Sequence, residues 1–206
     1  TASFELEDLA DLQTQIGNPD GQSKIRQVLL EAAQISLNTY LYSLVSPSAS
    51  APDHIRSGIT NFDASELLAN RQLASKARWM NEGGWWSLLD PSYMNDILSA
   101  TTLTSSDFNG ADAPVIGGKV ASTRFNFNIL EDNSAGLLQL SPGSAGQDCG
   151  LLFHPDFMYL VMGAPTFKVS DLHANHQHGY LVSVDMLVGA KLGIDGNIKH
   201  IQVYNT

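Results

Sequence analysis

The feature that most constrains the fold is a long helical pattern in residues 24–45, KIRQVLLEAAQISLNTYLYSLV. Its apolar residues recur every three or four positions, which places them on one face of an α-helix. Ser23, which follows the turn sequence NPDG, is a candidate N-cap. A helix of about six turns is longer than the average globular helix, so we expect a spine along which other elements pack. The apolar residues of the pattern are Ile25, Val28, Leu29, Ala32, Ala33 and Ile35.

Other segments carry weaker helix signals. Residues 63–77 begin with an Asp or Ser cap, and Pro91 stands at a first helical position directly after Asp90, which predicts a short helix over 91–100. HPDFMYLVMG, residues 154–163, also has a proline just inside its start and is predicted to be a helix. Residues 4–16, FELEDLADLQTQI, are a candidate for a shorter helix before the spine.

Strand signals dominate the rest of the chain. In residues 119–130 apolar and polar residues alternate, with Val120, Phe125 and Phe127 as the apolar members. This alternation predicts one strand. GLLF, residues 150–153, predicts another strand, and the tail reads as three strand-like runs separated by HANHQHG and GIDGN. Helices therefore come first and strands last, an order that favours an α+β fold over a doubly wound parallel sheet. We expect the last strands to return and pack against the spine helix.

The charge balance limits the classes of partner. Acidic residues outnumber basic ones by 21 to 11, for a net charge of −10, and the basic residues are scattered singly. Because dense phosphate contact needs clustered Lys and Arg, a sequence-reading nucleic-acid binder is not expected. The longest apolar-rich stretch, residues 150–163, is too short and too interrupted to span a membrane.

A histidine cluster is the strongest enzyme-like signal. DLHANHQHGY, residues 171–180, contains His173, His176 and His178, with Asp171 beside them and Asp185 nearby. Imidazoles and carboxylates are common zinc ligands, so a metal-dependent hydrolase is one alternative function. On a strand, however, His173 would face away from the other two, and Asn and Gly disfavour a helix here. A polar hairpin tip without metal is therefore the preferred interpretation.

The tryptophans and the cysteine offer two further candidates. Trp79, Trp85 and Trp86 could form a stacking platform for a small ligand, although such residues more often fill a core or a subunit contact. The single cysteine, Cys149, has no nearby Lys or Arg to lower its pKa, so a small structural residue is expected rather than a nucleophile. Phosphate-binding glycine loops and the nucleophile elbow are absent from the sequence. We therefore expect no catalytic residue, no cofactor and no metal.

The order of segments resembles that of tailed-phage major capsid proteins with the HK97-like fold. The similar passages are ARWMNEGGWWSLLDPSYMNDIL, GADAPVIGGKVASTRFNFNIL, GLLFHPDFMYLVMG and the tail from HQHGYLVSVDM to VYNT. The resemblance covers residues 20–206 but depends on element order rather than on an invariant signature. It implies a peripheral domain made of residues 1–60, with the spine helix, and return strands in 164–206. A mixed α/β axial domain would occupy residues 61–163.

The same resemblance implies a structural function. The chain would be a non-enzymatic capsid subunit that self-assembles into pentamers, hexamers and an icosahedral shell around the genome. Scaffold, portal and decoration proteins would be further partners, contact with packaged nucleic acid would be weak and non-specific, and no membrane would be involved. The protein would be made in the host cytoplasm and reside in the virion. In this mapping residues 171–180 connect two peripheral strands, and their histidines would act by protonation, altering subunit contacts as the pH falls.

The start of the chain departs from that family pattern. It lacks an initiating Met and a signal-peptide pattern, so we expect a processed or excised piece of a longer product. The N-terminal arm and extended loop that precede the spine helix in the family have no counterpart here. The subunit contacts that such segments make are therefore not implied for this piece.

The spacing of the histidines gives a first prediction. Replacing His173, His176 and His178 together with Ala should leave the fold and the assembly intact at neutral pH, because none of them is expected to bind metal. Metal analysis of the purified protein should find no stoichiometric zinc. One tightly bound metal ion per chain, with an activity lost on chelation, would contradict this interpretation.

Overall fold

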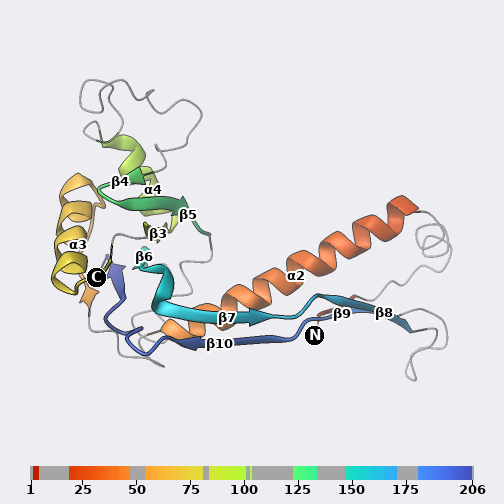
Figure 1. Ribbon diagram of the computed structural model, residues 1–206. Helices are drawn as coiled ribbons and strands as arrows, with labels where there is room; N and C mark the ends of the chain where they lie inside the picture. The colour runs from red at the N-terminus through yellow and green to blue at the C-terminus, as the bar shows by residue number, and fades with distance from the viewer. Residues whose placement is uncertain are drawn as a thin grey trace. The chain divides into compact units, whose positions relative to one another are not determined.

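The computed structural model describes residues 2–4, 19–46, 54–80, 84–100, 103, 123–133, 147–170 and 181–205 (Figure 1). The chain forms two compact units, each built from segments far apart in sequence. The first unit contains residues 1–40 and 160–190, and the second contains residues 41–159 and 191–206. Among the described residues, no helix has the length and hydropathy needed to cross a membrane.

The first unit combines one long helix with a three-stranded antiparallel sheet. Helix α2 (Pro19–Val45) contributes its residues up to Tyr40. The sheet has the order β1-β9-β8, with β1 (Ala2–Phe4), β8 (Thr166–Ser170) and β9 (Leu181–Asp185). Leu29 and Val184 are buried against each other, with Ala33 and Phe167 packed around them. This contact confirms that returning strands pack on the spine helix.

Strands β7 (Met158–Met162) and β10 (Val188–Leu192) form a separate two-stranded ribbon. The amide of Gly163 donates to the carbonyl of Leu187 at 2.8 Å, and the amide of Gly193 donates to the carbonyl of Phe157 at 2.8 Å. These two bonds bracket the ribbon and show that its strands run antiparallel.

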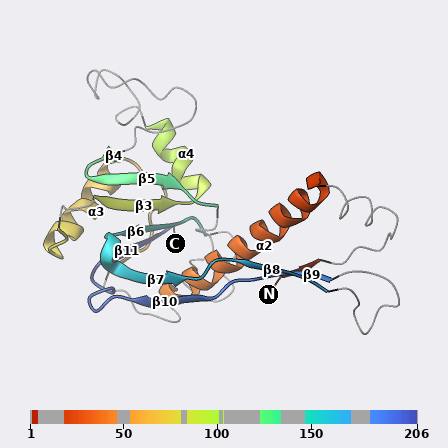
Figure 2. The same cartoon turned by 45° about the vertical axis from the view of Figure 1, so that its right-hand side comes forward.

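The second unit is built on a six-stranded mixed sheet with the order β2-β11-β6-β3-β5-β4. Figure 2 labels the strands from β11 to β4. Strand β11 pairs antiparallel with β6 and parallel with β2, and β3 pairs antiparallel with β6 and parallel with β5. The strands are β2 (Ile55–Arg56), β3 (Trp85–Leu89), β4 (Thr123–Arg124), β5 (Phe127–Glu131), β6 (Cys149–Phe153) and β11 (His200–Tyr204).

Both faces of this sheet are covered. Helices α3 (Ala64–Lys76) and α4 (Pro91–Ser99) supply Leu67, Tyr93 and Ile97 to the larger core, where they join residues such as Trp85 and Leu152. On β6, Leu151 alternates with Leu152 and joins a second core that contains Tyr42 and Val45 from the last turns of α2. All five residues of β11 are buried, which is typical of a strand covered on both faces.

Two aspartates fix the starts of the short helices. Asp63 caps α3 by accepting hydrogen bonds from the amides of Ser65 and Glu66, at 2.9 and 3.2 Å. Asp90 caps α4 through the amide of Tyr93 at 2.9 Å, and its other oxygen accepts the amide of Cys149 at 2.9 Å. Burial raises the pKa of Asp90, whereas the hydroxyl of Ser65 lowers that of Asp63. The helices expected at 63–77 and 91–100 are confirmed.

The long helix ends at a buried glutamine. The side-chain amide of Gln202 on β11 donates to the carbonyl of Val45, one of the last carbonyls of α2. The hydroxyl of Tyr204 donates to the other end of Gln202, its side-chain oxygen, at 2.7 Å. Helix ends leave carbonyls without intrahelical partners, and this one is satisfied by a side chain from the sheet.

Several sequence-based expectations are wrong in detail. The spine helix is confirmed but begins at Pro19, not after Ser23, since proline is well suited to a first turn. Residues 154–163 are not a helix: one 3-10 turn (Pro155–Phe157) is followed by strand β7. Residues 123–131 form a β4–β5 hairpin instead of one strand. Its turn places Phe125 and Asn126 at φ values of 49° and 76°, the combination of a tight hairpin turn.

The tail also differs from its expected pattern. It contains four strands, because residues 181–192 break into β9 and β10 around Met186 and Leu187. The helix expected at residues 4–16 lies outside the described residues, except that Phe4 belongs to strand β1.

The two aspartate caps give a matched stability prediction. Asp63→Ala should lower the free energy of unfolding by about 1 kcal/mol, because it removes one helix cap near the surface. Asp90→Ala should lower it by about 2–4 kcal/mol, because it also leaves the buried amide of Cys149 without an acceptor. Chemical denaturation of both variants measures the difference. Equal losses would show that the bond from Asp90 to β6 contributes nothing.

Candidate assembly surface

The histidine cluster lies outside the described residues. Asp171, His173, His176 and His178 fall in residues 171–180, which connect β8 with β9 next to the paired residues Ser170 and Leu181. The cluster therefore belongs to a connection between adjacent antiparallel strands of the first unit, as expected. Asp185 is described, and its carboxylate forms an ion pair with the ammonium group of Lys168 at 2.9 Å.

The described part of the chain offers no metal site. No group of three or more His, Cys, Asp or Glu side chains within it is arranged to hold an ion. Two of its histidines, His154 and His200, are buried in the second unit. His200 Nδ1 donates to the carbonyl of Gly196 at 2.6 Å, and His154 Nδ1 accepts the amide of Asp156 at 3.2 Å. Both side chains thus brace backbone turns.

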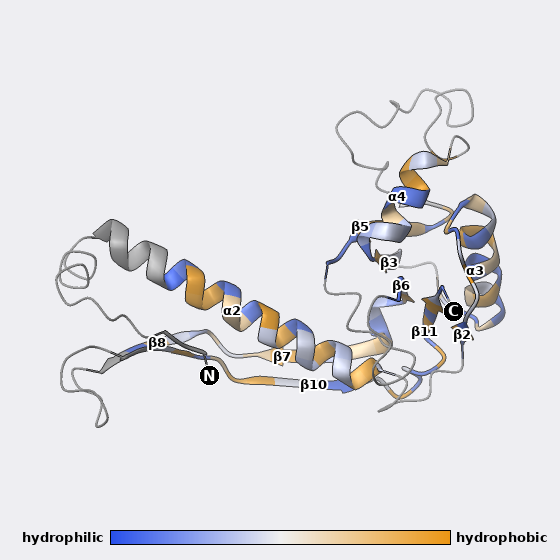
Figure 3. Cartoon of the chain, turned by 180° about the vertical axis from the view of Figure 1, so that it is seen from behind, coloured by the Kyte–Doolittle hydropathy of each residue, from blue (hydrophilic) through white to orange (hydrophobic). Residues whose placement is uncertain are grey.

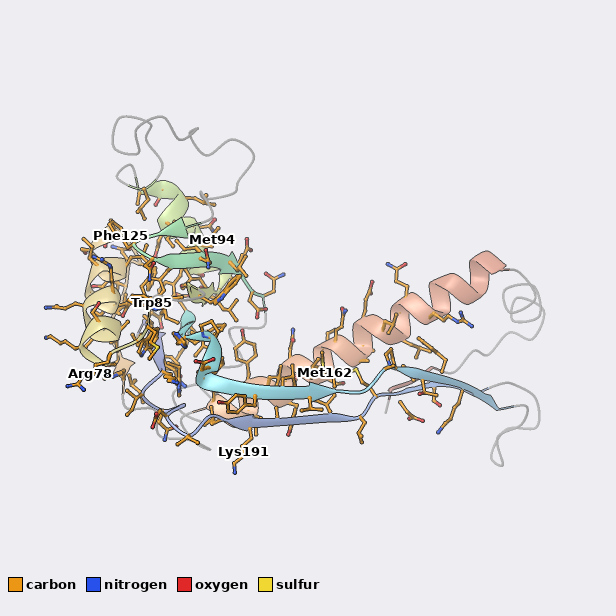
Figure 4. All side chains as sticks on the ribbon, viewed as in Figure 1. Arg78, Trp85, Met94, Phe125, Met162 and Lys191 are labelled. Carbon is orange, nitrogen blue, oxygen red and sulfur yellow. The ribbon has the colours of Figure 1, made fainter. Side chains whose placement is uncertain are left out.

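The tryptophans do not form a ligand platform. Trp79 and Trp85 are buried in the core of the second unit, where their rings meet edge to face at 5.6 Å. Figure 4 labels Trp85 among the side chains of this unit. Their indole N–H groups donate to the carbonyls of Ile198 and Met80, each at 2.8 Å. Trp86 is half-buried on β3. The alternative of a binding module that uses these residues is therefore not favoured.

Cys149 is a structural residue. Its side chain is fully buried, and burial, followed by the charges of Asp90 and Asp148, raises the pKa of the thiol to about 12. The thiolate, which is the reactive form, is therefore scarce at neutral pH. This agrees with the expectation from the sequence.

Apolar side chains are exposed on the part of the β7–β10 ribbon that belongs to the first unit. Leu160, Val161 and Met162 on β7 and Leu187 before β10 form what we call the ribbon surface. Val161 exposes 75% of its area and Leu187 83%. Successive residues of a strand point to opposite faces, so three consecutive exposed residues mean that neither face of β7 is covered here. Such a run is typical of a contact surface that a partner covers.

Helix α2 also exposes apolar residues. Val28 and Ile35 are exposed by 52% and 66%, although Leu29 between them is buried. Figure 3 shows hydrophobic and hydrophilic stretches alternating around the described part of this helix. The helix thus has apolar residues on more than the one face that packs on the sheet, which is typical of a helix with further neighbours.

A groove of about 300 Å³ lies between the helix and the strands of the first unit. Its lining contains no charged residue, although the chain as a whole carries a net charge of −10. The floor includes Val184, which is buried, and the rim includes Ser36, which is exposed. The lining residues are Ala33, Ser36, Leu37, Tyr40, Val184, Met186 and Val188.

The ribbon surface was missed by the sequence analysis. The sequence predicts a helix over residues 154–163, whereas Met158–Met162 form strand β7. The missed signal is the run Tyr159-Leu160-Val161, rich in residues that favour strands. The groove depends on residues more than 140 positions apart, and no local pattern predicts it.

The buried thiol gives a third prediction. Native protein at pH 8 should react with iodoacetamide at Cys149 at least about a hundredfold more slowly than protein unfolded in guanidinium chloride, because burial limits both access and ionisation. Leu68→Cys, at a half-exposed position on α3, is the matched control and should react at once. Rapid labelling of native Cys149, measured by mass spectrometry, would contradict its burial.

The sequence matches no protein-family model and no curated protein. The fold, in contrast, matches solved structures over nearly the whole chain. A structure described as Mycobacterium phage Che8 has a TM-score of 0.70 at 14% identity, covering 98% of this chain and 68% of that one. The capsid structure of cyanophage P-SCSP1u gives 0.66 at 14% identity, covering 98% and 70%. The procapsid of satellite phage P4, which includes the size determination protein Sid, gives 0.53 at 9% identity, covering 99% and 69%. The chain therefore has the HK97-like α+β capsid fold that the order of its segments predicted.

Proposed function

We propose that this protein is a structural subunit of a bacteriophage capsid, which self-assembles into capsomers and an icosahedral shell around the genome. The observation that carries the proposal is the fold match over 98% of the chain to a phage capsid structure. The exposed apolar residues of the first unit are a second observation in its favour. Covering Val161 and Leu187 with a partner would remove their apolar area from water, which is favourable.

The two units fit this function. We propose that the peripheral domain expected from the sequence, residues 1–60 and 164–206, is centred on the first unit, although residues 41–60 and 191–206 of that range belong to the second unit. The axial domain, residues 61–163, is centred on the second. A long helix with extended strands offers large lateral surfaces, and closed rings of identical subunits use different patches of each neighbour.

The partners follow from the same proposal. The main partner is the protein itself, in pentamers, hexamers and the shell. A size-determining or scaffold protein is a further partner, since the P4 procapsid contains one, and portal and decoration proteins complete the particle. The protein is made in the host cytoplasm and resides in the virion. Its net charge of −10 suits a wall that does not bind packaged nucleic acid tightly.

An enzymatic role has less support. The metal-dependent hydrolase would depend on Asp171, His173, His176 and His178, since Asp185 is paired with Lys168 and no group within the described residues is arranged to hold a metal ion. We therefore propose a structural and non-enzymatic protein without a cofactor.

A charge placed on the ribbon surface tests the function. The protein expressed from its complete gene, with its scaffold where one exists, should form particles visible by negative-stain electron microscopy. Val161→Lys should abolish or strongly reduce these particles, because a lysine would be buried without a partner. Its melting temperature should stay within a few degrees of the parent, since the side chain is exposed in the isolated chain.

Thr166→Lys on β8 is the matched control. It adds the same charge at an exposed polar position in the same unit and should still assemble. If the parent protein stayed monomeric at high concentration and varied salt, the capsid function would be wrong. If Val161→Lys formed normal particles, the ribbon surface would instead have no part in the contacts between copies of the protein.

A further inference from the structure

Two glycines in the ribbon of strands β7 and β10 are not required by the fold of the single chain. Gly163 follows β7 and Gly189 lies within β10, and neither has a positive φ value. A Cβ atom added to Gly189 would meet no atom within 4 Å, and one added to Gly163 would approach the Cβ of Leu187 at 3.5 Å, an ordinary contact. Glycine weakens a strand, and it often marks a place where another backbone comes close.

Other described glycines have a reason within the chain. Gly58 and Gly84 have φ values of 78° and 72°, which a residue with a side chain rarely adopts. A Cβ atom on Gly193 or Gly196 would come within 2.7 or 2.6 Å of a backbone carbonyl oxygen. For the two glycines of the ribbon, the close approach of a second molecule is the structural reason that remains.

The register of the ribbon sets these glycines opposite two exposed apolar side chains. The backbone hydrogen bonds at the two ends of the ribbon have the same antiparallel register, so the strands pair between them without a bulge. Gly163 therefore lies opposite Leu187, and Gly189 lies opposite Val161. Both of these apolar side chains are largely exposed, and all four residues belong to the first unit.

The four residues lie on one face of the ribbon, which we call its outer face. Side chains directly opposite each other in an antiparallel pair point to the same side, and so do residues two apart along a strand. Met186 and Val188, which alternate with Leu187 and Gly189, line the groove beside α2. The outer face is thus the face of the ribbon that is turned away from this groove.

Side chains alternate with open positions on the outer face in both directions. On the β7 side, Val161 is followed by the open position at Gly163, and on the β10 side, Leu187 is followed by the open position at Gly189. Across the ribbon, each apolar side chain lies opposite a glycine. The outer face is therefore a two-by-two chequerboard, with the apolar side chains on one diagonal and the glycines on the other.

Such a chequerboard is complementary to itself. When a second copy is turned over by a two-fold axis in the plane of the ribbon, along the strands or across them, its two side chains lie over the two glycines of the first copy. The reverse is also true, because a two-fold contact uses the same patch on both subunits. Four apolar side chains are then removed from water, and the absent Cβ atoms let the two backbones approach.

The charge of the outer face also suits a second copy. Each chain carries a net charge of −10, so copies repel each other, and contact between them is favoured where the surface is uncharged. None of the four residues is charged. On the neighbouring strands β8 and β9, Lys168 and Asp185 neutralise each other in an ion pair at 2.9 Å. The face thus offers no charge to a partner of opposite sign, whereas its shape fits another copy of itself.

We propose that two copies of this chain pack outer face to outer face about a two-fold axis, with Val161 and Leu187 of each copy over Gly163 and Gly189 of the other. The inference rests on the proposed capsid function for the identity of the partner. It adds the symmetry of the contact and the part that the glycines play in it. Icosahedral symmetry contains two-fold axes, so a contact of this symmetry has a place in the proposed shell.

Filling one open position tests the part of the glycines. Gly189→Val should leave the melting temperature of the chain unchanged or raise it, because a Cβ atom meets nothing there and valine favours strands. It should raise the protein concentration needed for particle formation at least about tenfold, because the new side chain meets a side chain of the second copy. Thr166→Val, at an exposed strand position outside the outer face, is the control and should assemble as the parent does.

Moving a side chain instead of adding one gives the sharper comparison. With a two-fold axis along the strands, Val161 of the second copy lies over Gly189, and adding Val161→Gly to Gly189→Val should restore assembly. With an axis across the strands, Leu187 lies there, and adding Leu187→Gly should restore it instead. One of the two double variants, and not both, is expected to recover, because each restores the chequerboard for one axis only.

A single-cysteine variant tests the symmetry directly. In a two-fold contact, Val161 of one copy lies beside Val161 of the other, whereas in a head-to-tail contact it meets a different patch. Val161→Cys under assembly conditions with a short bismaleimide should therefore give covalent dimers, and the native Cys149 is buried and should not react. Leu68→Cys, half-exposed on α3, is the control and should give at least about tenfold less dimer.

The outcomes separate this inference from the proposed function. If the parent formed particles while Val161→Cys gave no more dimer than Leu68→Cys, the two-fold contact would be overturned and the capsid function would stand. Parent-like assembly of Gly189→Val, or recovery of both double variants or of neither, would also overturn it. If Gly189→Val lowered the melting temperature, the cross-linking result would decide. Specific Val161→Cys dimers in a protein that never forms particles would support the contact and count against the capsid function.

Discussion

The structure of the second unit depends on strand β11 and on the bonds that Gln202 makes there. This strand lies between β2 and β6, is buried on both faces, and carries Ile201 and Val203 into one core and Tyr204 into the other. Its Gln202 binds the carbonyl of Val45, so the end of the long helix is tied to the middle of the sheet. A buried amide must satisfy its polar groups, and Gln202 does so with a free carbonyl at the end of the helix and the hydroxyl of Tyr204.

A well-packed interior and an apolar exterior occur in the same chain. The two cores of the second unit bury most of its described aromatic residues, and Asp90 and Tyr93 form buried hydrogen bonds. The ribbon surface and Ile194 nevertheless remain in solvent. Other large apolar side chains are exposed as well, among them Val28 and Ile35 on α2. The described residues thus combine fully packed cores with an apolar exterior, and the proposed function gives that exterior a use.

Local signals predicted the helices with side-chain caps. Asp63 and the pair Asp90–Pro91 mark the starts of α3 and α4 at the observed residues, because capping depends on neighbours in sequence. Strand β7 could not be recognised in the same way, because an apolar run without periodicity fits a helix or a strand. Its pairing with β10, a long-range contact, makes it a strand. The hairpin turn at Phe125 was also hidden, since a positive φ is rare for a bulky residue and is held by tertiary packing. The groove and the exposed surfaces depend on long-range contacts alone.

The position of β11 in the sequence has a consequence for biosynthesis. Strands β2, β3, β5 and β6 all leave the ribosome before β11. Strands β2 and β6 therefore lack the strand that lies between them until residues 200–204 arrive. Earlier strands can pair only incompletely, because long-range pairing must wait for the later sequence. The sequence therefore delays the strand that β2 and β6 share as a neighbour until almost all of the other strands of the sheet have been made.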